Sequence, residues 1–220
     1  YTCNSVTINN GATFLNAAYH YTLTVNNSFT NNGTLSNNIN GWNLTVNIKG
    51  NVVNNGIWKP YATTLVGNSN QYLTCGANKK FEGVFNISDT LGDIYLNSNV
   101  WFDNNALNMN QVKFYTNGYV LKGTAQNITY GRIFTNDTMD LNQCNFIGIT
   151  VTGSFAIKGK LWLQSGNTFN GTVTIMDTLL DNYYHYSLTV NGNFINRGVI
   201  MRDPNFWNLS LYISGNIENY

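Results

Sequence analysis

Short alternations of hydrophobic and polar residues, interrupted by Asn-Gly pairs, run along the whole chain. Leu23-Thr24-Val25 and Leu44-Thr45-Val46 are two of these triplets, and Asn32-Gly33 and Asn55-Gly56 are two of the interruptions. A period of two with β-branched residues is typical of a half-buried strand, and Asn-Gly is typical of a tight turn. No long run has hydrophobic residues at helical spacing. The pattern therefore predicts an all-β protein made of short strands.

The triplets return at nearly constant intervals. Leu23–Asn26 returns as Leu44–Asn47, and Phe29–Gly33 returns as Val52–Gly56 at almost the same spacing. Short repeats of this kind are typical of solenoids, in which each repeat forms one rung and stacked rungs share a core. We expect a right-handed parallel β-helix of about ten rungs of 21–23 residues. A β-sandwich is the alternative, because frequent turns between short strands also suit that fold.

Two longer segments are also duplicated. Residues 19–55 align without a gap with residues 184–220, and 18 of the 37 aligned positions are identical. A second marker at residues 81–93 returns at residues 169–181. We expect residues 1–220 to form a single β-solenoid domain that is a fragment of a longer repetitive protein.

Asparagine is the main polar residue of the chain. There are 41 Asn, whereas only 10% of the residues are charged, against about 25% in ordinary soluble domains. Asn suits tight turns, and stacked Asn side chains form ladders between identical strands, although an AT-rich genome would also raise the Asn content. The net charge of +1, with no basic run, argues against nucleic-acid binding. The absence of a long hydrophobic run argues against membrane insertion.

Three cysteines, Cys3, Cys75 and Cys144, lie far apart in the sequence. An odd and widely spaced set predicts neither a disulfide framework nor a metal site. We expect these cysteines to be small buried residues, and we expect neither a metal nor a cofactor.

Clustered acids near a basic residue are the chemistry that a sugar-cleaving enzyme would need. The best local cluster of this kind consists of Asp137, Asp140 and Arg132. Solvated turn residues are the alternative interpretation, and it is the default.

The aromatic residues of the long repeat are candidates for ligand binding. Exposed Tyr and Trp rings make amphipathic platforms for sugars or proteins, whereas buried rings would belong to the core. The candidates are Tyr19, Tyr21 and Trp42 in the first copy and Tyr184, Tyr186 and Trp207 in the second. His20 and His185 accompany them, and we expect each to be a hydrogen-bonded or stacked turn residue, because the repeat places them several rungs apart.

Three Asp-Thr-hydrophobic triplets resemble the O-glycan acceptor motif of exported Bacteroidota proteins. The resemblance implies sugars on Thr90, Thr138 and Thr178. Sequons for N-glycosylation also occur, as expected by chance in a chain so rich in Asn and Thr.

The sequence from Leu188 to Gly198, with its variant from Leu44 to Gly56, resembles the Asn/Gly-rich β-helix regions of large Bacteroidota surface and secreted proteins. These include adhesin-like proteins exported by the type IX pathway. The resemblance implies an extracellular or cell-surface location, a non-catalytic structural or adhesive role, and glycans or other surface proteins as partners. The alternative is a glycan-binding module or a polysaccharide-degrading enzyme on a β-helix scaffold, although no Gly-His-Gly or comparable catalytic signature occurs.

Overall fold

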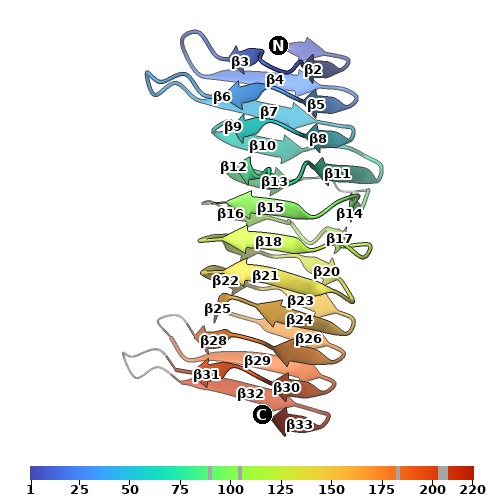
Figure 1. The fold of residues 1–220 in the computed structure, drawn as a ribbon, viewed down its shortest axis with the longest axis vertical. Coiled ribbons are helices and arrows are strands. Elements are labelled where there is room, and N and C mark those ends of the chain that lie inside the picture. The colour runs from blue at the N-terminus through green and yellow to red at the C-terminus, as the bar shows by residue number, and fades with distance from the viewer. Residues whose placement is uncertain (89–90, 104–105, 182–183, 203–207) are drawn as a thin grey trace.

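The chain winds into a parallel β-helix with three sheets (Figure 1). The structure, a computed structural model, describes residues 1–88, 91–103, 106–181, 184–202 and 208–220. Within these ranges each strand pairs in parallel with the strand three places further along, so that the chain passes through the three sheets in turn eleven times. The predicted parallel β-helix is therefore confirmed. Among the described residues no helix forms, and so none is long enough to cross a membrane.

Each sheet contains eleven strands of two to six residues among the described residues. Sheet A consists of β1 (Thr2–Cys3), β4 (Tyr21–Val25), β7 (Leu44–Ile48), β10 (Ala62–Leu65), β13 (Val84–Ile87), β16 (Ala106–Asn108), β19 (Asn127–Thr129), β22 (Cys144–Ile147), β25 (Lys160–Leu163), β28 (Thr178–Asp181) and β31 (Val199–Met201). Sheet B consists of β2 (Val6–Ile8), β5 (Phe29–Asn31), β8 (Val52–Asn54), β11 (Gln71–Cys75), β14 (Ile94–Leu96), β17 (Lys113–Tyr115), β20 (Arg132–Phe134), β23 (Thr150–Thr152), β26 (Asn167–Asn170), β29 (Tyr186–Asn191) and β32 (Leu209–Ile213). Sheet C consists of β3 (Thr13–Leu15), β6 (Thr34–Ser36), β9 (Ile57–Lys59), β12 (Phe81–Glu82), β15 (Val100–Asp103), β18 (Leu121–Thr124), β21 (Thr138–Asn142), β24 (Phe155–Lys158), β27 (Val173–Ile175), β30 (Phe194–Asn196) and β33 (Ile217–Asn219).

The core is made of columns of hydrophobic side chains that run along the rod. Alternate side chains of each strand point inward, which is the period of two seen in the sequence. In sheet C, Trp58, Phe81 and Phe102 follow one another on successive rungs, and each is no more than 1% exposed. Their ring centroids are 5.3 and 5.7 Å apart. Burying such a side chain contributes about 1.5–3 kcal/mol, so stacking supplies the stability that one rung could not have alone.

Buried asparagines form part of these inward columns. Asn31 Nδ2 donates hydrogen bonds to Asn54 Oδ1 at 3.0 Å and to the Ile57 carbonyl at 2.8 Å. The side-chain oxygens of Asn31 and Asn54 accept from the backbone N–H of Gly33 and Gly56, respectively. Each Asn thus satisfies the polar backbone of the tight corner that follows it. The predicted Asn ladder is confirmed here.

Rung length varies along the rod. Asn31 of β5 pairs with Asn54 of β8, and this interval of 23 is the expected one. In the middle of the chain, however, Arg132 pairs with Thr150 and Thr150 pairs with Thr168, and the rungs there are shorter, with intervals of 18. The expected rung length therefore holds over most of both ends and fails in the middle, because the corner loops there shrink to between one and three residues. It also fails between β7 and β10, where Thr45 pairs with Ala62 at an interval of 17.

The duplicated segments lie on different sheets. Tyr21–Val25 forms β4 in sheet A, whereas the matching Tyr186–Val190 belongs to β29 in sheet B. Phe81 lies in sheet C, and the matching Phe169 lies in sheet B. The three sheets therefore offer equivalent environments, each needing an inward-alternating strand followed by a tight corner. The repeated unit is a strand with its corner, independent of the sheet that it joins.

Candidate functional site

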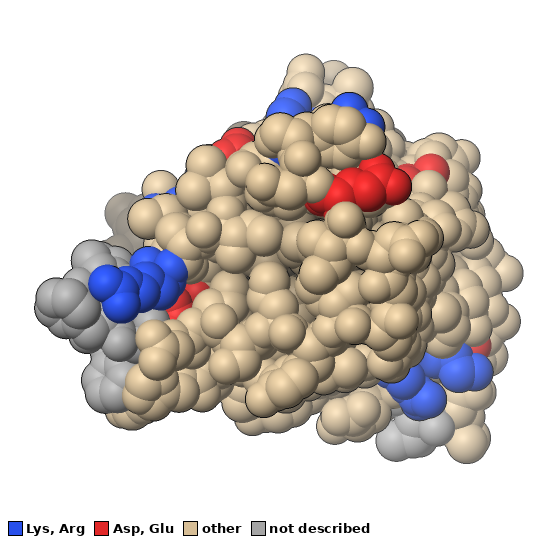
Figure 2. Space-filling view, turned by 90° about the horizontal axis from the view of Figure 1, so that it is seen from below, with Lys and Arg blue, Asp and Glu red and all other residues tan. Residues whose placement is uncertain are grey.

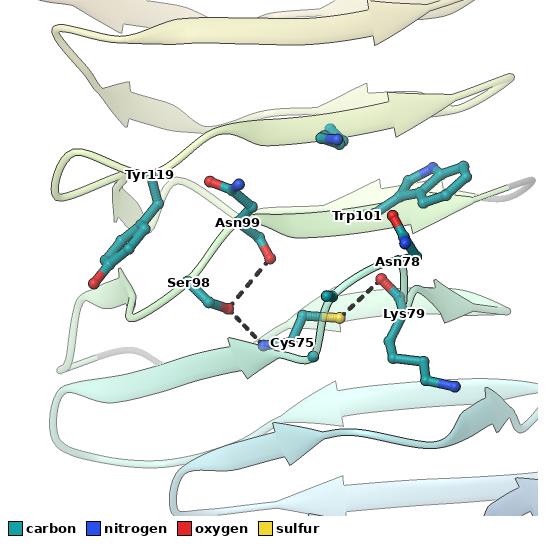
Figure 3. A pocket seen from close by; sticks show the side chains of 10 residues that line it. Cys75, Asn78, Lys79, Ser98, Asn99, Trp101 and Tyr119 are labelled. Carbon is teal, nitrogen blue, oxygen red and sulfur yellow. Dashed lines mark hydrogen bonds between the residues drawn. The ribbon is translucent and has the colours of Figure 1, made fainter.

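The corner between sheets B and C changes in length from rung to rung. Its loops 76–80 and 116–120 have five residues each, whereas loop 97–99 between them has three. Because stacked rungs share one corner, a short loop between two longer ones leaves a depression. The depression has a volume of about 410 Å³, and we call it the first corner hollow (Figure 3).

Two aromatic side chains flank the first corner hollow. Tyr119, in the second five-residue loop, is 38% exposed, and Trp101 of β15 is half-buried. Figure 3 shows the two rings on opposite sides, with Asn99 between them. Trp101 is held in place, since its Nε1 donates to Thr124 Oγ1 at 2.9 Å and Lys80 Nζ lies 5.3 Å from its ring centroid. The hollow thus has two aromatic walls, of which Trp101 is fixed by these contacts.

Hydrogen bonds fix the floor of this hollow. Ser98 Oγ accepts from the Cys75 backbone N–H at 2.6 Å and donates to the Asn99 carbonyl at 3.2 Å. The Cys75 thiol donates to the Lys79 carbonyl at 3.0 Å. Burial raises the pKa of Cys75 to about 11, so the thiol is neutral near pH 7 and is not a nucleophile. The floor therefore offers hydrogen-bonding groups and no covalent chemistry.

The first corner hollow has a positive lining. Lys79 and Lys122 belong to it, and no carboxylate of the described residues does. Neither ammonium group lies within 4.0 Å of a carboxylate oxygen in the part of the chain that the structure describes. In Figure 3 the Lys79 ammonium points away from the hollow, so that residue lines it mainly with its stem.

The same corner is hollowed again beyond loop 116–120. One depression of about 500 Å³ is lined by Tyr115 and Phe134 among others, and a neighbouring one of about 450 Å³ shares Asn136 and Asp137 with it. We call the pair the second corner hollow. It forms because the next corner loops, 135–137, 153–154 and 171–172, have only two or three residues. Loop 116–120 is thus a ridge between two hollows.

An aromatic ladder on the outer face of sheet B leads into the second corner hollow. Tyr72, Tyr95, Tyr115 and Phe134 stack on successive rungs, with centroids 5.4, 4.8 and 4.8 Å apart and interplanar angles of 27°, 7° and 19°. The rings cover one another's faces until Phe134, whose next neighbour in the column is Thr152. The sequence analysis missed this ladder because the interval between its members shortens from one rung to the next.

The structure does not bring the predicted catalytic cluster together. Arg132 lies on the outer face of sheet B, where its guanidinium donates to the Gln111 carbonyl. Asp137 lies in the corner loop and accepts from Thr116 Oγ1 at 3.2 Å. Asp140 lies on sheet C, in register with Lys122. A corner turns the chain between these positions, so the three residues lie on sheet B, at the corner and on sheet C, and a catalytic role for them stays a prediction.

The predicted aromatic platform is exposed but not flat. Tyr19 is 65% exposed and its ring centroid lies 5.4 Å from that of Trp42, at 48°. Tyr184 is 62% exposed and meets Tyr186 edge-on, with centroids 6.1 Å apart. Tyr21 instead packs against the hydrophobic core. Trp207 lies outside the described residues.

The two histidines are hydrogen-bonded turn residues, as predicted. His20 Nδ1 accepts from the Asn43 backbone N–H at 3.1 Å, and His185 Nδ1 accepts from that of Asn208 at 3.1 Å. His20 also packs edge-on against Trp42. Each histidine therefore ties one rung to the next, a role that the duplication has preserved.

The remaining predictions have mixed outcomes. Cys75 and Cys144 are buried, as expected, whereas Cys3 is half-buried, and all three are free thiols. Thr138 and Thr178 lie at the starts of β21 and β28 and are half-buried, and their glycosylation stays a prediction. Thr90 lies outside the described residues.

Charge gives no further site on the face that Figure 2 shows, which is the C-terminal end of the rod. Acidic and basic side chains of the described residues are scattered there and form no single patch.

Comparisons with protein-family models, with curated proteins and with solved structures found no match.

Proposed function

We propose that this chain is a rigid, non-catalytic segment of a cell-surface or secreted protein, with a structural or adhesive role. The observation that carries the proposal is the unbroken parallel stacking of three sheets through about ten turns. At about 4.8 Å per rung, the stack places groups at its two ends roughly 50 Å apart. The cell-surface location rests on the resemblance to Asn/Gly-rich β-helix regions of Bacteroidota surface and secreted proteins.

Stiffness supports the structural part of the proposal. Consecutive strands within every sheet are hydrogen-bonded along the rod, and the inward columns fill its centre. A hinge would have to break a rung-to-rung ladder on three sheets at once. Such a rod holds the groups that it carries at fixed distances and directions.

The arrangement of the two exposed tyrosines of the long repeat, Tyr19 and Tyr184, supports the adhesive part. β4 and β29 are 25 strands apart, or eight and one third turns, which corresponds to about 40 Å. The rod twists, as stacked strands do, and Figure 1 shows β4 and β29 beginning on the same side of it (left in the view). Tyr19 and Tyr184, which come just before these strands, therefore lie on the same side of the rod. Two weak contacts on one rigid body reinforce each other when the partner is extended.

Adhesion and turnover assays test this proposal together. The chain is displayed on a non-adherent cell, and retention on glycan-coated and protein-coated surfaces under flow is compared with that of cells displaying an unrelated β-helix. We expect stronger retention on at least one surface, and weaker retention for Tyr19→Ala with Tyr184→Ala.

The turnover assay measures release of reducing ends from polysaccharides by the purified chain. We expect none above background. Release that Asp137→Asn abolishes would replace the proposal with a polysaccharide-degrading enzyme, and retention equal to the control on every surface would remove the adhesive role.

A further inference from the structure

We propose that the corner between sheets B and C binds an oligosaccharide across loop 116–120, with an acidic sugar in the first corner hollow and a neutral sugar in the second. This goes beyond a structural or adhesive role, because it assigns a site and a ligand class to particular residues. Tyr19 and Tyr184, the exposed tyrosines of the long repeat, take no part in this site.

The lining of the first corner hollow matches both surfaces of a sugar ring. A sugar has hydroxyl groups around its edge and C–H groups on its faces. Asn78, Ser98 and Asn99 offer amide and hydroxyl groups, while Trp101 and Tyr119 offer flat apolar surface on either side. Amphipathic aromatic walls with a few polar groups are the usual composition of a ligand site.

Charge distinguishes the two hollows. Lys122 belongs to the first hollow, which has no acidic residue among the described residues of its lining. Asp137 is the acidic residue of the second hollow, whose described lining includes no basic residue. A carboxylate on the ligand is therefore favoured in the first hollow and disfavoured in the second, where Asp137 can accept hydrogen bonds from hydroxyl groups.

The geometry favours an extended chain over a single sugar. The hollows follow one another along the rod axis and are separated only by the loop that carries Tyr119. Successive rungs are about 4.8 Å apart, which is close to the length of one sugar residue in a polymer. Loop 116–120 occupies one rung of its own, so an oligosaccharide lying along the corner can place one residue in the first hollow, one over Tyr119 and the next in the second hollow.

A nucleotide would also stack on aromatic rings and pair with lysine, but the observations favour a sugar. A second phosphate would meet Asp137 rather than another cation. The net charge of +1 offers no field for a polyanion with one charge per unit.

Titration calorimetry with four probes tests the proposal on the whole chain. The first is a tetrasaccharide of one terminal glucuronate followed by three N-acetylglucosamine residues, the second is a tetragalacturonate, the third is a neutral tetrasaccharide of N-acetylglucosamine, and the fourth is AMP. We expect the tetrasaccharide with one glucuronate to bind most tightly and the neutral one about tenfold more weakly.

Substitutions locate the site. We expect Tyr119→Ala to weaken every saccharide at least tenfold, and Lys122→Gln to remove the preference for the acidic sugar while Lys122→Arg keeps it. Tyr212→Ala is the matched control, because this tyrosine is 63% exposed and lines neither hollow. Thermal melting checks that each variant is folded.

The proposal is overturned if no saccharide binds, if Tyr119→Ala binds as well as Tyr212→Ala does, or if AMP binds more tightly than every saccharide. A tighter neutral probe would overturn the assignment of the acidic sugar to the first hollow. None of these results would affect the rigid-segment proposal, whose tests do not depend on this corner.

Discussion

The side-chain amide of Asn31 donates a 3.0 Å hydrogen bond to Oδ1 of Asn54, which stands one rung further along the inside of the rod. Their neighbours Asn32 and Asn55 form an amide pair at 2.9 Å on the outside, with Asn55 as the donor, where water can replace it. The inner pair is buried and also bonds the backbone of the corner, whereas the outer pair is exposed to water. Comparing the two pairs therefore shows what burial and the corner hydrogen bonds add to an Asn ladder.

Replacing Asn54 by Ala should destabilise the chain far more than replacing Asn55 by Ala. The first substitution leaves buried partners unsatisfied, including the Gly56 N–H, and each buried unsatisfied group costs about 1–3 kcal/mol. The second exposes its partner to water and should cost less than about 0.5 kcal/mol. Urea unfolding of both variants measures the difference. Equal losses would mean that burial of the ladder is not what matters.

The aromatic column predicts a large cost for Phe81→Ala. Phe81 packs against Trp58, Phe85 and Phe102, with centroids 5.3, 5.3 and 5.7 Å away, so the substitution leaves a cavity in three contacts at once. We expect a loss of about 3–5 kcal/mol in unfolding free energy. Tyr61→Ala, at an exposed position, is the control and should lie near zero.

Close stacking of the corners predicts that two glycines with positive φ respond differently to alanine. A Cβ on Gly153 (φ 127°) would lie 1.9 Å from the Thr135 carbonyl oxygen, whereas one on Gly166 (φ 67°) would meet no atom within 4 Å. Gly166→Ala should cost only the backbone strain of about 1–2 kcal/mol. Gly153→Ala should cost clearly more, because the Thr135 corner must move. Thermal melts that show equal shifts would contradict this tight stacking.

Thiol labelling should follow burial. Burial raises the pKa of Cys75 to about 11 and that of Cys144 to about 12, so both stay protonated and slow to react at pH 8, whereas half-buried Cys3 should react first. Mass spectrometry after brief iodoacetamide treatment identifies the modified residue.

The raised pKa values of Cys75 and Cys144 also predict how the unfolding free energy changes with pH. The folded pKa values lie above the ordinary thiol value, so their contribution is intact below about pH 8.5 and is lost as pH rises toward 11–12. Unfolding free energy should therefore fall above pH 9, and Cys144→Ala should flatten that fall. An unchanged slope in the variant would contradict a buried neutral thiol.

The fold could be predicted because the alternation of hydrophobic and polar residues within each strand shows which side chains point inward. Leu23-Thr24-Val25 and Leu44-Thr45-Val46 show the alternation and the spacing directly, and the tight corners appear as Asn-Gly. The shorter rungs around Thr150 could not be predicted, because the residues there match the repeat only in alternation and not in identity. The sheet that each copy of the long repeat joins could not be predicted either, because the interval between Tyr19 and Tyr184 does not give the number of strands between them.

The corner hollows escaped the sequence analysis for a related reason. They depend on differences of two or three residues between stacked loops, and on the placing of Tyr119 beside Trp101 across rungs. Strand ends are uncertain by about as many residues when read from a sequence. Asp137 was predicted to lie with Arg132, whereas it lines a hollow together with Asn136 and Phe134.

The central claim is a stiff rod of stacked rungs, and stretching single molecules by their two ends with optical tweezers tests it most directly. Because each rung contacts only its neighbours, rungs should detach as units. The chain released by one rung gives steps of roughly 60–80 Å in contour length. Extension in such steps from a stiff initial state is the predicted result. Smooth extension at low force, without steps of rung size, would contradict the account.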